Sequence, residues 1–283
     1  MNISIVEALR WAADVLDQNG VAEARREAGA LLSHVIGKDR TFLISHAEDL
    51  IGENEQQHFE EAVMRRAAGE PAQYIIGSQD FYGRAFRVTP AVLIPRPETE
   101  LLVEAALEVM KANAEICDVG TGSGCIAITL LCERDNARAV ALDVSEAALE
   151  IARENASAWS VGPRIKLVTS DCFTALNEST DKFNLIVSNP PYVAANVISG
   201  LQREVREHEP LVALSPGEDG LSVIRRLVND SPRFLRDNGH LIMEIGFDQG
   251  EAVQQLVDKN VWILKEIRPD LQCIPRIVVL QKK

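Results

Sequence analysis

The sequence contains no run of about 18 consecutive apolar residues, so it predicts no membrane-spanning helix. Residues 1–7 lack the basic start and the apolar stretch of a secretory signal peptide, and we therefore expect the protein to act in the cytoplasm. Internal repeats and low-complexity tracts are missing too. With 46% apolar and 25% charged residues, the composition is that of an ordinary globular protein. Its 283 residues suffice for one large domain and a small one.

Potential metal ligands are few and scattered. The five cysteines are odd in number and include no C-x-x-C pair, which argues against both a disulfide framework and a zinc site. The five histidines show no H-x-x-x-H spacing. We therefore predict that the protein holds no metal ion.

Basic surface is also scarce, because the net charge is -13. A protein whose main partner is nucleic acid usually carries a basic face, since contacts to phosphates supply most of the affinity. The arginine doublets at 25–26, 65–66 and 225–226 lie isolated within helical patterns, and we interpret them as solvated helix faces. The charge balance disfavours DNA or RNA as the main partner, although it does not exclude a local basic patch.

The N-terminal part of the chain has the apolar spacing of helices. The helices predicted from this spacing cover residues 5–16, 22–36 and 53–68. Ser4 and Glu7 are spaced as a capping box before the first of them, and Gly37 ends the second. The segment therefore reads as a small helical bundle without chemistry of its own.

After the bundle the pattern changes to that of short strands. Residues 74–77 and 81–88 predict a β-hairpin, and Pro97 is placed to start another helix. The domains that we expect are a helical domain at 1–72, a hairpin linker at 73–97 and a main domain at 98–283.

The main domain alternates strands and helices, which predicts an α/β fold with a doubly wound, Rossmann-like sheet of seven strands. The strands are expected at residues 115–120, 137–144, 165–171, 183–189, 240–246, 261–267 and 276–281. Only residues 268–275 separate the last two, which leaves no room for a crossover helix. We therefore expect these two strands to form an antiparallel pair at one edge.

A glycine-rich segment, Asp118-Val119-Gly120-Thr121-Gly122-Ser123-Gly124, follows the first of these strands. Glycines between a strand and a helix let the backbone approach a ligand closely, with the helix N-terminus behind it. Asp143 ends the second strand, where an acid can accept both hydroxyls of a ribose. Asp171 ends the third, where an acid can face an adenine amine. Nicotinamide enzymes share such a loop, but the G-x-G-x-G spacing and the antiparallel edge favour S-adenosylmethionine.

The segment Asn189-Pro190-Pro191-Tyr192 closes the apolar run at 183–188. A strand cannot continue through two prolines, so this turn holds the Asn amide and the Tyr ring rigidly at the sheet edge. An amide pairs with the NH2 group of another amide or of a nucleobase, and a Tyr ring stacks on the same planar group. The alternative interpretation is a polar loop that merely ends a strand.

Together these segments resemble the N5-glutamine methyltransferases of peptide-chain release factors, a family of class I S-adenosylmethionine-dependent enzymes. The resemblance covers nearly the whole chain. The residues that carry it are Phe81-Tyr82-Gly83 with Phe86 and Val88, Val92-Leu93-Ile94-Pro95-Arg96-Pro97-Glu98-Thr99-Glu100, the glycine-rich segment, and Val187-Ser188-Asn189-Pro190-Pro191-Tyr192. NPPY alone is shared with amino-methyltransferases of DNA and RNA, whereas the R-P-E-T-E segment at this distance before the loop is far more specific.

The resemblance implies methyl transfer from S-adenosylmethionine, with S-adenosylhomocysteine as product, to the Gln of the Gly-Gly-Gln motif in release factors. The cofactor-binding residues that it implies are Gly120, Thr121, Gly122, Ser123 and Gly124 at the methionine part, Asp143 at the ribose, Asp171 and Cys172 near the adenine, and Asn189. The substrate-binding residues are Asn189, Pro190, Pro191 and Tyr192. The chain departs from the family pattern at Cys172, where Trp is common, and at Cys273-Ile274, where Gly and a basic residue are usual.

The mechanism that we predict assigns the catalytic role to Asn189 and Pro190. The Asn189 side-chain oxygen and the Pro190 carbonyl would accept the two hydrogens of the Gln NH2 group and orient its nitrogen. The runner-up function is an amino-methyltransferase of adenine or guanine in DNA or RNA, and a non-catalytic scaffold is a third. We expect a monomer whose helical domain docks the release factor, with no direct contact to nucleic acid or membrane.

Overall fold

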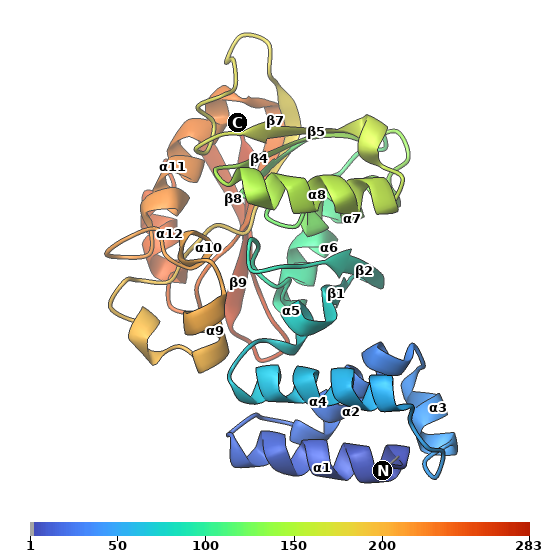
Figure 1. Ribbon diagram of the computed structural model, residues 1–283. Coiled ribbons are helices and arrows are strands. Elements are labelled where there is room, and N and C mark those ends of the chain that lie inside the picture. The colour runs from blue at the N-terminus through green and yellow to red at the C-terminus, as the bar shows by residue number, and fades with distance from the viewer. Residues whose placement is uncertain (1–2) are drawn as a thin grey trace. The chain divides into compact units, whose positions relative to one another are not determined.

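The computed structural model describes residues 3–283, which fall into two compact units (Figure 1). The helical unit comprises the chain up to Ser78 and the later segment Gln202–His208. The sheet unit comprises Gln79–Leu201 and Glu209–Lys283. Within residues 3–283, every helix is too short or too polar to cross a bilayer.

The helical unit begins with the capping box that the sequence predicts. The Glu7 N–H donates to the Ser4 hydroxyl, and the Ser4 N–H donates back to the Glu7 carboxylate. Its helices are α1 (Ile5–Gln18), α2 (Ala24–Ile36), α3 (Arg40–Ser45), α4 (Glu53–Ala67), α5 (Ala72–Ile76) and α9 (Arg203–His208). Leu16, Leu31 and Phe59 are fully buried between them. The three predicted helices are thus confirmed as α1, α2 and α4.

The strand expected at 74–77 is wrong, because this segment forms helix α5. The carbonyl of Pro71 accepts hydrogen bonds from the N–H groups of Tyr74 and Ile75, which closes a helical turn. Gly77 then ends the helix in the left-handed conformation, with φ at 80°. The hairpin therefore starts later, with β1 (Ser78–Phe81) and β2 (Arg84–Arg87).

The sheet unit contains the seven predicted strands. They are β3 (Glu115–Val119), β4 (Arg138–Asp143), β5 (Ile165–Thr169), β6 (Phe183–Ser188), β7 (Leu235–Glu244), β8 (Trp262–Pro269) and β9 (Pro275–Lys282). Each lies within a few residues of its expected range. The helices are η1 (Pro97–Thr99), α6 (Glu100–Val109), α7 (Cys125–Glu133), α8 (Glu146–Ala158), η2 (Gly162–Arg164), η3 (Ile198–Gly200), α10 (Leu211–Leu214), α11 (Ser222–Asp230), η4 (Ser231–Arg233) and α12 (Gly250–Leu256).

The strands are ordered β5-β4-β3-β6-β7-β9-β8 in one sheet. Neighbours from β5 to β7 pair in parallel, whereas β9 runs antiparallel to both β7 and β8. The antiparallel pair at one edge is therefore confirmed, with β8 as the edge strand. The seven strands and the Rossmann-like class agree with the fold expected from the sequence.

Apolar side chains on successive strand residues pack on opposite faces of the sheet, because side chains alternate along a strand. In β3, for example, Ile116 belongs to the core cluster with α6 and α7, and Cys117 to the cluster with α11 and α12. The two groups of helices accordingly cover the two faces of the sheet (Figure 1). Buried runs without polar alternation, such as β6, are typical of strands covered on both faces.

The chain direction across the sheet reverses next to β3. From β3 the chain first adds β4 and β5 on one side and then crosses back to add β6 on the other. Ligands of such sheets bind at the carboxyl ends of the strands at this switch point. The glycine-rich loop after β3, Asp143 at the end of β4 and Asn189 after β6 all lie at this edge.

Candidate active site

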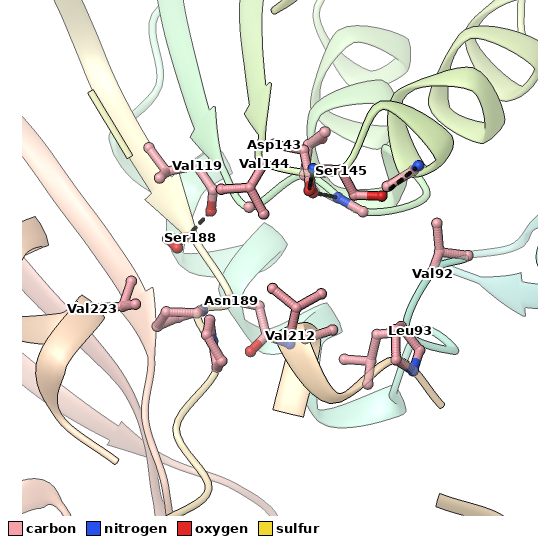
Figure 2. Close-up of a pocket in the computed structure, with 18 of the residues that line it drawn as sticks. Val92, Leu93, Val119, Asp143, Val144, Ser145, Ser188, Asn189, Val212 and Val223 are labelled. Atoms are coloured by element: carbon pink, nitrogen blue, oxygen red, sulfur yellow. Dashed lines mark hydrogen bonds between the residues drawn. The ribbon is translucent and has the colours of Figure 1, made fainter. Parts of the chain in front are cut away.

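A cavity of about 270 Å³ opens at this edge of the sheet, within the sheet unit. Its walls come from the ends of β3, β4, β5 and β6, from residues 91–99 and from residues 210–216. Figure 2 shows the apolar side chains of Leu93, Val212 and Val223 around Asn189. The cavity is therefore lined mainly by apolar groups, with a few polar groups from the strand ends, as is usual for small-molecule sites.

The glycine-rich loop is held in place by main-chain hydrogen bonds. The N–H groups of Gly120 and Thr121 both donate to the carbonyl of Leu142, at 2.8 and 2.9 Å. From beneath, one carboxylate oxygen of Asp118 accepts the Thr121 hydroxyl at 2.7 Å and the Ala127 N–H at 3.3 Å. Burial raises the pKa of Asp118 to about 7, against the effect of these hydrogen bonds.

The predicted loop residues do not all face the cavity. Gly120, Thr121, Gly122 and Ser123 line it, whereas Gly124 does not. Gly124 has φ at 81°, and a Cβ atom there would lie 2.7 Å from Ile128. Its requirement for glycine thus comes from the packing of α7 behind the loop.

Asp143 lies beside the loop with both carboxylate oxygens already bound to backbone. Gly122 N–H donates to Oδ2 at 2.8 Å. Ser145 N–H donates to Oδ1 at 2.9 Å (Figure 2). Each oxygen keeps a lone pair for a further donor. Burial raises the pKa of Asp143, and the backbone donors oppose that rise. The carboxylate is therefore fixed by the backbone and keeps acceptor capacity for two further donors, and its contact with a ribose stays a prediction.

Asp171 and Cys172 both line the cavity, but differently. The Asp171 side chain is 62% exposed and its carboxylate accepts from Arg226 at 2.6 Å. Cys172 is buried among apolar side chains that include Phe173. The contact of Asp171 with an adenine amine stays a prediction. Next to Asp171, the cavity wall includes the apolar groups of Cys172 and Val144.

The NPPY turn follows β6 directly. Ser188, the last strand residue, donates its hydroxyl to the carbonyl of Val119 at 2.7 Å, so the turn is tied to the start of the glycine-rich loop (Figure 2). Asn189, Pro190 and Pro191 line the cavity. The Asn189 side chain donates through Nδ2 to the hydroxyl of Thr99 at 3.0 Å. Among the described residues, none donates to the Asn189 Oδ1 atom or to the Pro190 carbonyl.

Tyr192 is placed differently from Asn189. It is absent from the cavity lining, and its hydroxyl donates to Glu244 at 3.1 Å. Burial raises the pKa of Tyr192, and the neighbouring Glu244 raises it further, so the phenol stays protonated as a donor. The stacking of this ring on a substrate amide stays a prediction, whereas its anchoring of the turn is direct.

Several residues of the site could not be identified from the sequence as site residues. Thr99 and Glu244 contact the NPPY turn from η1 and β7, and Gln249 Nε2 donates to the carbonyl of Tyr192 at 3.0 Å. The stronger of two available signals was at Thr99, which lies inside the R-P-E-T-E segment that carried the resemblance. Glu244 gave a weaker signal as a carboxylate that ends a buried strand.

The described cavity lining contains no His, Lys or Arg side chain. Its titratable groups are the carboxylates of Asp143 and Asp171 and the thiols of Cys125 and Cys172, and burial raises the pKa of both thiols. An acceptor pair beside a glycine-rich loop is suited to bind and orient an NH2 group, and it does not itself withdraw a proton.

Comparisons with known proteins agree with this geometry. Residues 7–77 match the family model of the PrmC N-terminal domain, and residues 97–205 match that of the methyltransferase small domain. Among solved structures, a methyltransferase from Pyrococcus furiosus has a TM-score of 0.53 at 14% identity, covering 82% of this chain and 99% of the other. A ribosomal protein L11 methylase from Lactobacillus delbrueckii has a TM-score of 0.51 at 20% identity, with coverage of 72% and 90%. These structures show the shared fold.

Curated relatives are much closer in sequence. The release factor glutamine methyltransferase of Cereibacter sphaeroides is 45% identical over 272 residues, which is 96% of each chain. Relatives of the same name are 40% identical in Koribacter versatilis, over 99% of both chains, and 39% identical in Bacillus subtilis, over 93% and 94%. With this similarity over nearly the full length, the chain belongs to the release factor glutamine methyltransferase family.

Proposed function

We propose that the protein transfers a methyl group from S-adenosylmethionine to the side-chain amide nitrogen of the Gln in the Gly-Gly-Gln motif of peptide-chain release factors. One observation carries the proposal beyond family membership. Asn189 turns its Nδ2 atom to Thr99, so its oxygen is left to accept from an NH2 group in the same cavity as the glycine-rich loop.

The residues present fit the cofactor. Both Asp143 oxygens are fixed by backbone N–H groups and keep free lone pairs, which suits two ribose hydroxyls. The loop at Gly120–Ser123 would hold the methionine part, with Cys172 and Asp171 at the adenine. When bound, S-adenosylmethionine supplies an electrophilic methyl group on a sulfonium.

The protein's own contribution is to orient the acceptor nitrogen. An amide nitrogen is a poor nucleophile because its lone pair is delocalised into the carbonyl. Asn189 Oδ1 and the Pro190 carbonyl accept its two hydrogens, which holds the nitrogen in one direction and favours its pyramidalisation. Such positioning supplies on the order of 7–11 kcal/mol of barrier lowering. The proton leaves to water after transfer, since no His or Lys side chain lines the described cavity.

The same acceptors explain the choice of Gln over Glu. A Glu carboxylate has no hydrogens to donate, so Asn189 and Pro190 would face its lone pairs and stay unpaired. A site built to bind an NH2 group typically rejects a partner without one by ~10⁴-fold or more.

The release factor itself needs contacts beyond one side chain. We propose that the helical domain at residues 1–72 docks this partner, because binding energy from remote contacts is what places one Gln of a large protein.

We further propose that the enzyme acts as a monomer in the cytoplasm, with no direct contact to nucleic acid or membrane. The net charge of -13 supports the absence of a nucleic-acid partner.

The experiment is an assay of tritiated methyl transfer to three substrates: purified release factor, DNA and RNA. Mass spectrometry then locates the methyl group in the Gly-Gly-Gln peptide. The proposal predicts label on the release factor alone, at the Gln. Label on nucleic acid with none on the release factor would contradict it.

A further inference from the structure

Four polar side chains link the two ends of the NPPY turn through the buried edge of the sheet. Asn189 Nδ2 donates to Thr99 Oγ1 at 3.0 Å, and Thr99 Oγ1 donates to Glu244 Oε2 at 2.6 Å. On the other carboxylate oxygen, Glu244 Oε1 accepts the Tyr192 hydroxyl at 3.1 Å. Thr99 is 2% exposed and Glu244 1% exposed, so water does not compete for these hydrogen bonds.

The number of hydrogens on each side chain fixes the direction of these three hydrogen bonds. An ionised carboxylate only accepts, so both hydroxyls must point their hydrogens at Glu244. A hydroxyl has one hydrogen, and that of Thr99 is used by Glu244. Thr99 can therefore only accept from Asn189, which puts the Asn189 NH2 group against Thr99 and leaves its oxygen for the cavity.

We propose that Glu244 acts through Thr99 as a positioning pair, which keeps the Asn189 amide turned with its oxygen toward the substrate NH2 group. This inference rests on the proposed function and adds two positioning residues to it. Neither residue needs to touch the reacting atoms, because the effect passes through the orientation of one amide.

The opposite orientation of Asn189 shows what the pair prevents. With the amide turned by 180°, its oxygen would meet a Thr99 hydroxyl that has no hydrogen left. Its NH2 group would then meet the substrate NH2 group, donor against donor. The turned form instead suits a carboxylate, so the pair also contributes to the choice of Gln over Glu.

The acceptor role of Glu244 rests on its two hydroxyl donors, Thr99 and Tyr192. Burial raises the pKa of this carboxyl, whereas the hydrogen bonds from Thr99 and Tyr192 and the charge of Arg276 on β9 lower it, and Glu98 raises it. The net effect is a raised pKa, and the two donating hydroxyls are the contacts that oppose the rise and favour the ionised acceptor.

The test compares Thr99→Val, Thr99→Ser and Glu244→Gln in methyl transfer to whole release factor. Thr99→Val keeps the shape of the side chain but removes its acceptor, and we expect kcat to fall about 10- to 100-fold, as for a misoriented catalytic group. Thr99→Ser keeps the hydroxyl and should restore most of the activity. Glu244→Gln replaces one acceptor oxygen of the carboxylate by an NH2 donor. We expect a comparable fall in kcat, with the affinity for S-adenosylmethionine retained.

Thr129→Val is a matched control. Thr129 is fully buried on α7, and its hydroxyl has no hydrogen-bond partner among the described residues. This variant makes the same change at another fully buried threonine, which has no hydrogen bond to the turn, and it should keep the activity of the unmodified protein.

Two readouts separate positioning from a merely structural role. In an Asn189→Ala background, Thr99→Val should cause no further loss, because its effect passes through Asn189. In Glu244→Gln, the affinity for a release factor with Gly-Gly-Glu, relative to that for the unmodified Gly-Gly-Gln, should rise about tenfold, since the NH2 group of the turned amide donates to a carboxylate.

Full activity in Thr99→Val, or a further loss from this change in the Asn189→Ala background, would overturn the inference. If Thr99→Val does not fold, Glu244→Gln tests the inference alone. The two measurements are then its kcat and its relative affinity for the release factor with Gly-Gly-Glu. An unmodified protein that methylates no release factor would instead refute the proposed function, so the two failures are distinguishable.

Discussion

Asn189 and Thr99 lie 90 residues apart in the chain, yet the side-chain amide of one donates to the hydroxyl of the other at 3.0 Å. This contact joins the two most specific segments of the sequence, N-P-P-Y and R-P-E-T-E, at one wall of the cavity. It explains how a Thr in a segment that precedes the glycine-rich loop comes to line the same cavity. The amide is thereby oriented before any substrate arrives.

Asp143→Ala should weaken the affinity for S-adenosylmethionine. The change removes an ionised acceptor for two hydroxyls, which corresponds to about 10- to 100-fold in Kd. Calorimetric titration with the cofactor measures the effect, and kcat at saturating cofactor should change little. Asp171→Ala is the matched control: its carboxylate is largely exposed and paired with Arg226, so the loss should be smaller. Equal affinities for Asp143→Ala and the unmodified protein would remove the ribose assignment.

Gly220→Ala should lower both kcat and the free energy of unfolding. A Cβ atom at this position would lie 2.4 Å from the Tyr192 carbonyl, and φ is 70°, so the NPPY turn must move. The expected destabilisation is about 1–3 kcal/mol. Gly217→Ala provides the comparison, because φ is also positive there but no atom lies within 4 Å. Denaturant unfolding and kcat, measured on both variants, check the prediction; similar kcat values would contradict it.

Arg66→Ala should destabilise the helical unit. The Arg66 guanidinium donates to the carboxylates of both Glu27 and Glu204, and its side chain is 6% exposed. Removal leaves two partly buried carboxylates without their partner, a loss of roughly 3 kcal/mol. Arg65→Ala is the neighbouring control, since Arg65 is 52% exposed and its pair with Glu70 should be worth less than about 1 kcal/mol. Equal unfolding free energies for the two variants would refute the difference.

The stability of the cofactor-free protein should fall between mildly acidic and neutral pH because of Asp118. Burial raises the pKa of this carboxyl from 3.8 to about 7, so the folded state holds a proton that the unfolded state has lost. The stabilisation is complete below pH 3.8 and disappears as the pH rises through 7. The slope from this one group reaches roughly 1.4 kcal/mol per pH unit.

Asp118→Asn provides the measurement for that prediction. Asn keeps an oxygen for the Thr121 hydroxyl and the Ala127 N–H but does not titrate in this range. Urea unfolding at a series of pH values should therefore give a flatter profile for the variant. Parallel profiles would show that the titrating group is another.

Local patterns were sufficient to predict the sheet. Strands such as β6 are short, mostly apolar runs that a helix period does not fit, and the short connection at 268–275 required an antiparallel pair. The capping box at Ser4 and the left-handed Gly37 are likewise local signals that the structure confirms. In each case the information lies within a few residues of the element that it specifies.

The errors and omissions arose where the deciding contact is distant in sequence or the local signal is ambiguous. The β-branched pair at 75–76 favoured a strand, but Pro71 and Gly77 enclose a single helical turn. Segment 202–208 belongs to the helical unit through the ion pair of Glu204 with Arg66, 138 residues away. Glu244 likewise reaches Thr99 across 145 residues. Contacts between residues so distant in sequence produce no local periodic pattern from which they could be predicted.

The measurement that tests the account most directly is mass spectrometry of the Gly-Gly-Gln peptide after incubation of release factor with S-adenosylmethionine and either the unmodified enzyme or Asn189→Ala. The account predicts one added methyl group on the Gln with the unmodified enzyme and a loss of at least ~10²-fold in its rate of formation with the variant, as for removal of an electrostatic partner of the reacting group. Cofactor affinity should be nearly the same in both proteins. Normal methylation of the Gln by Asn189→Ala would contradict it.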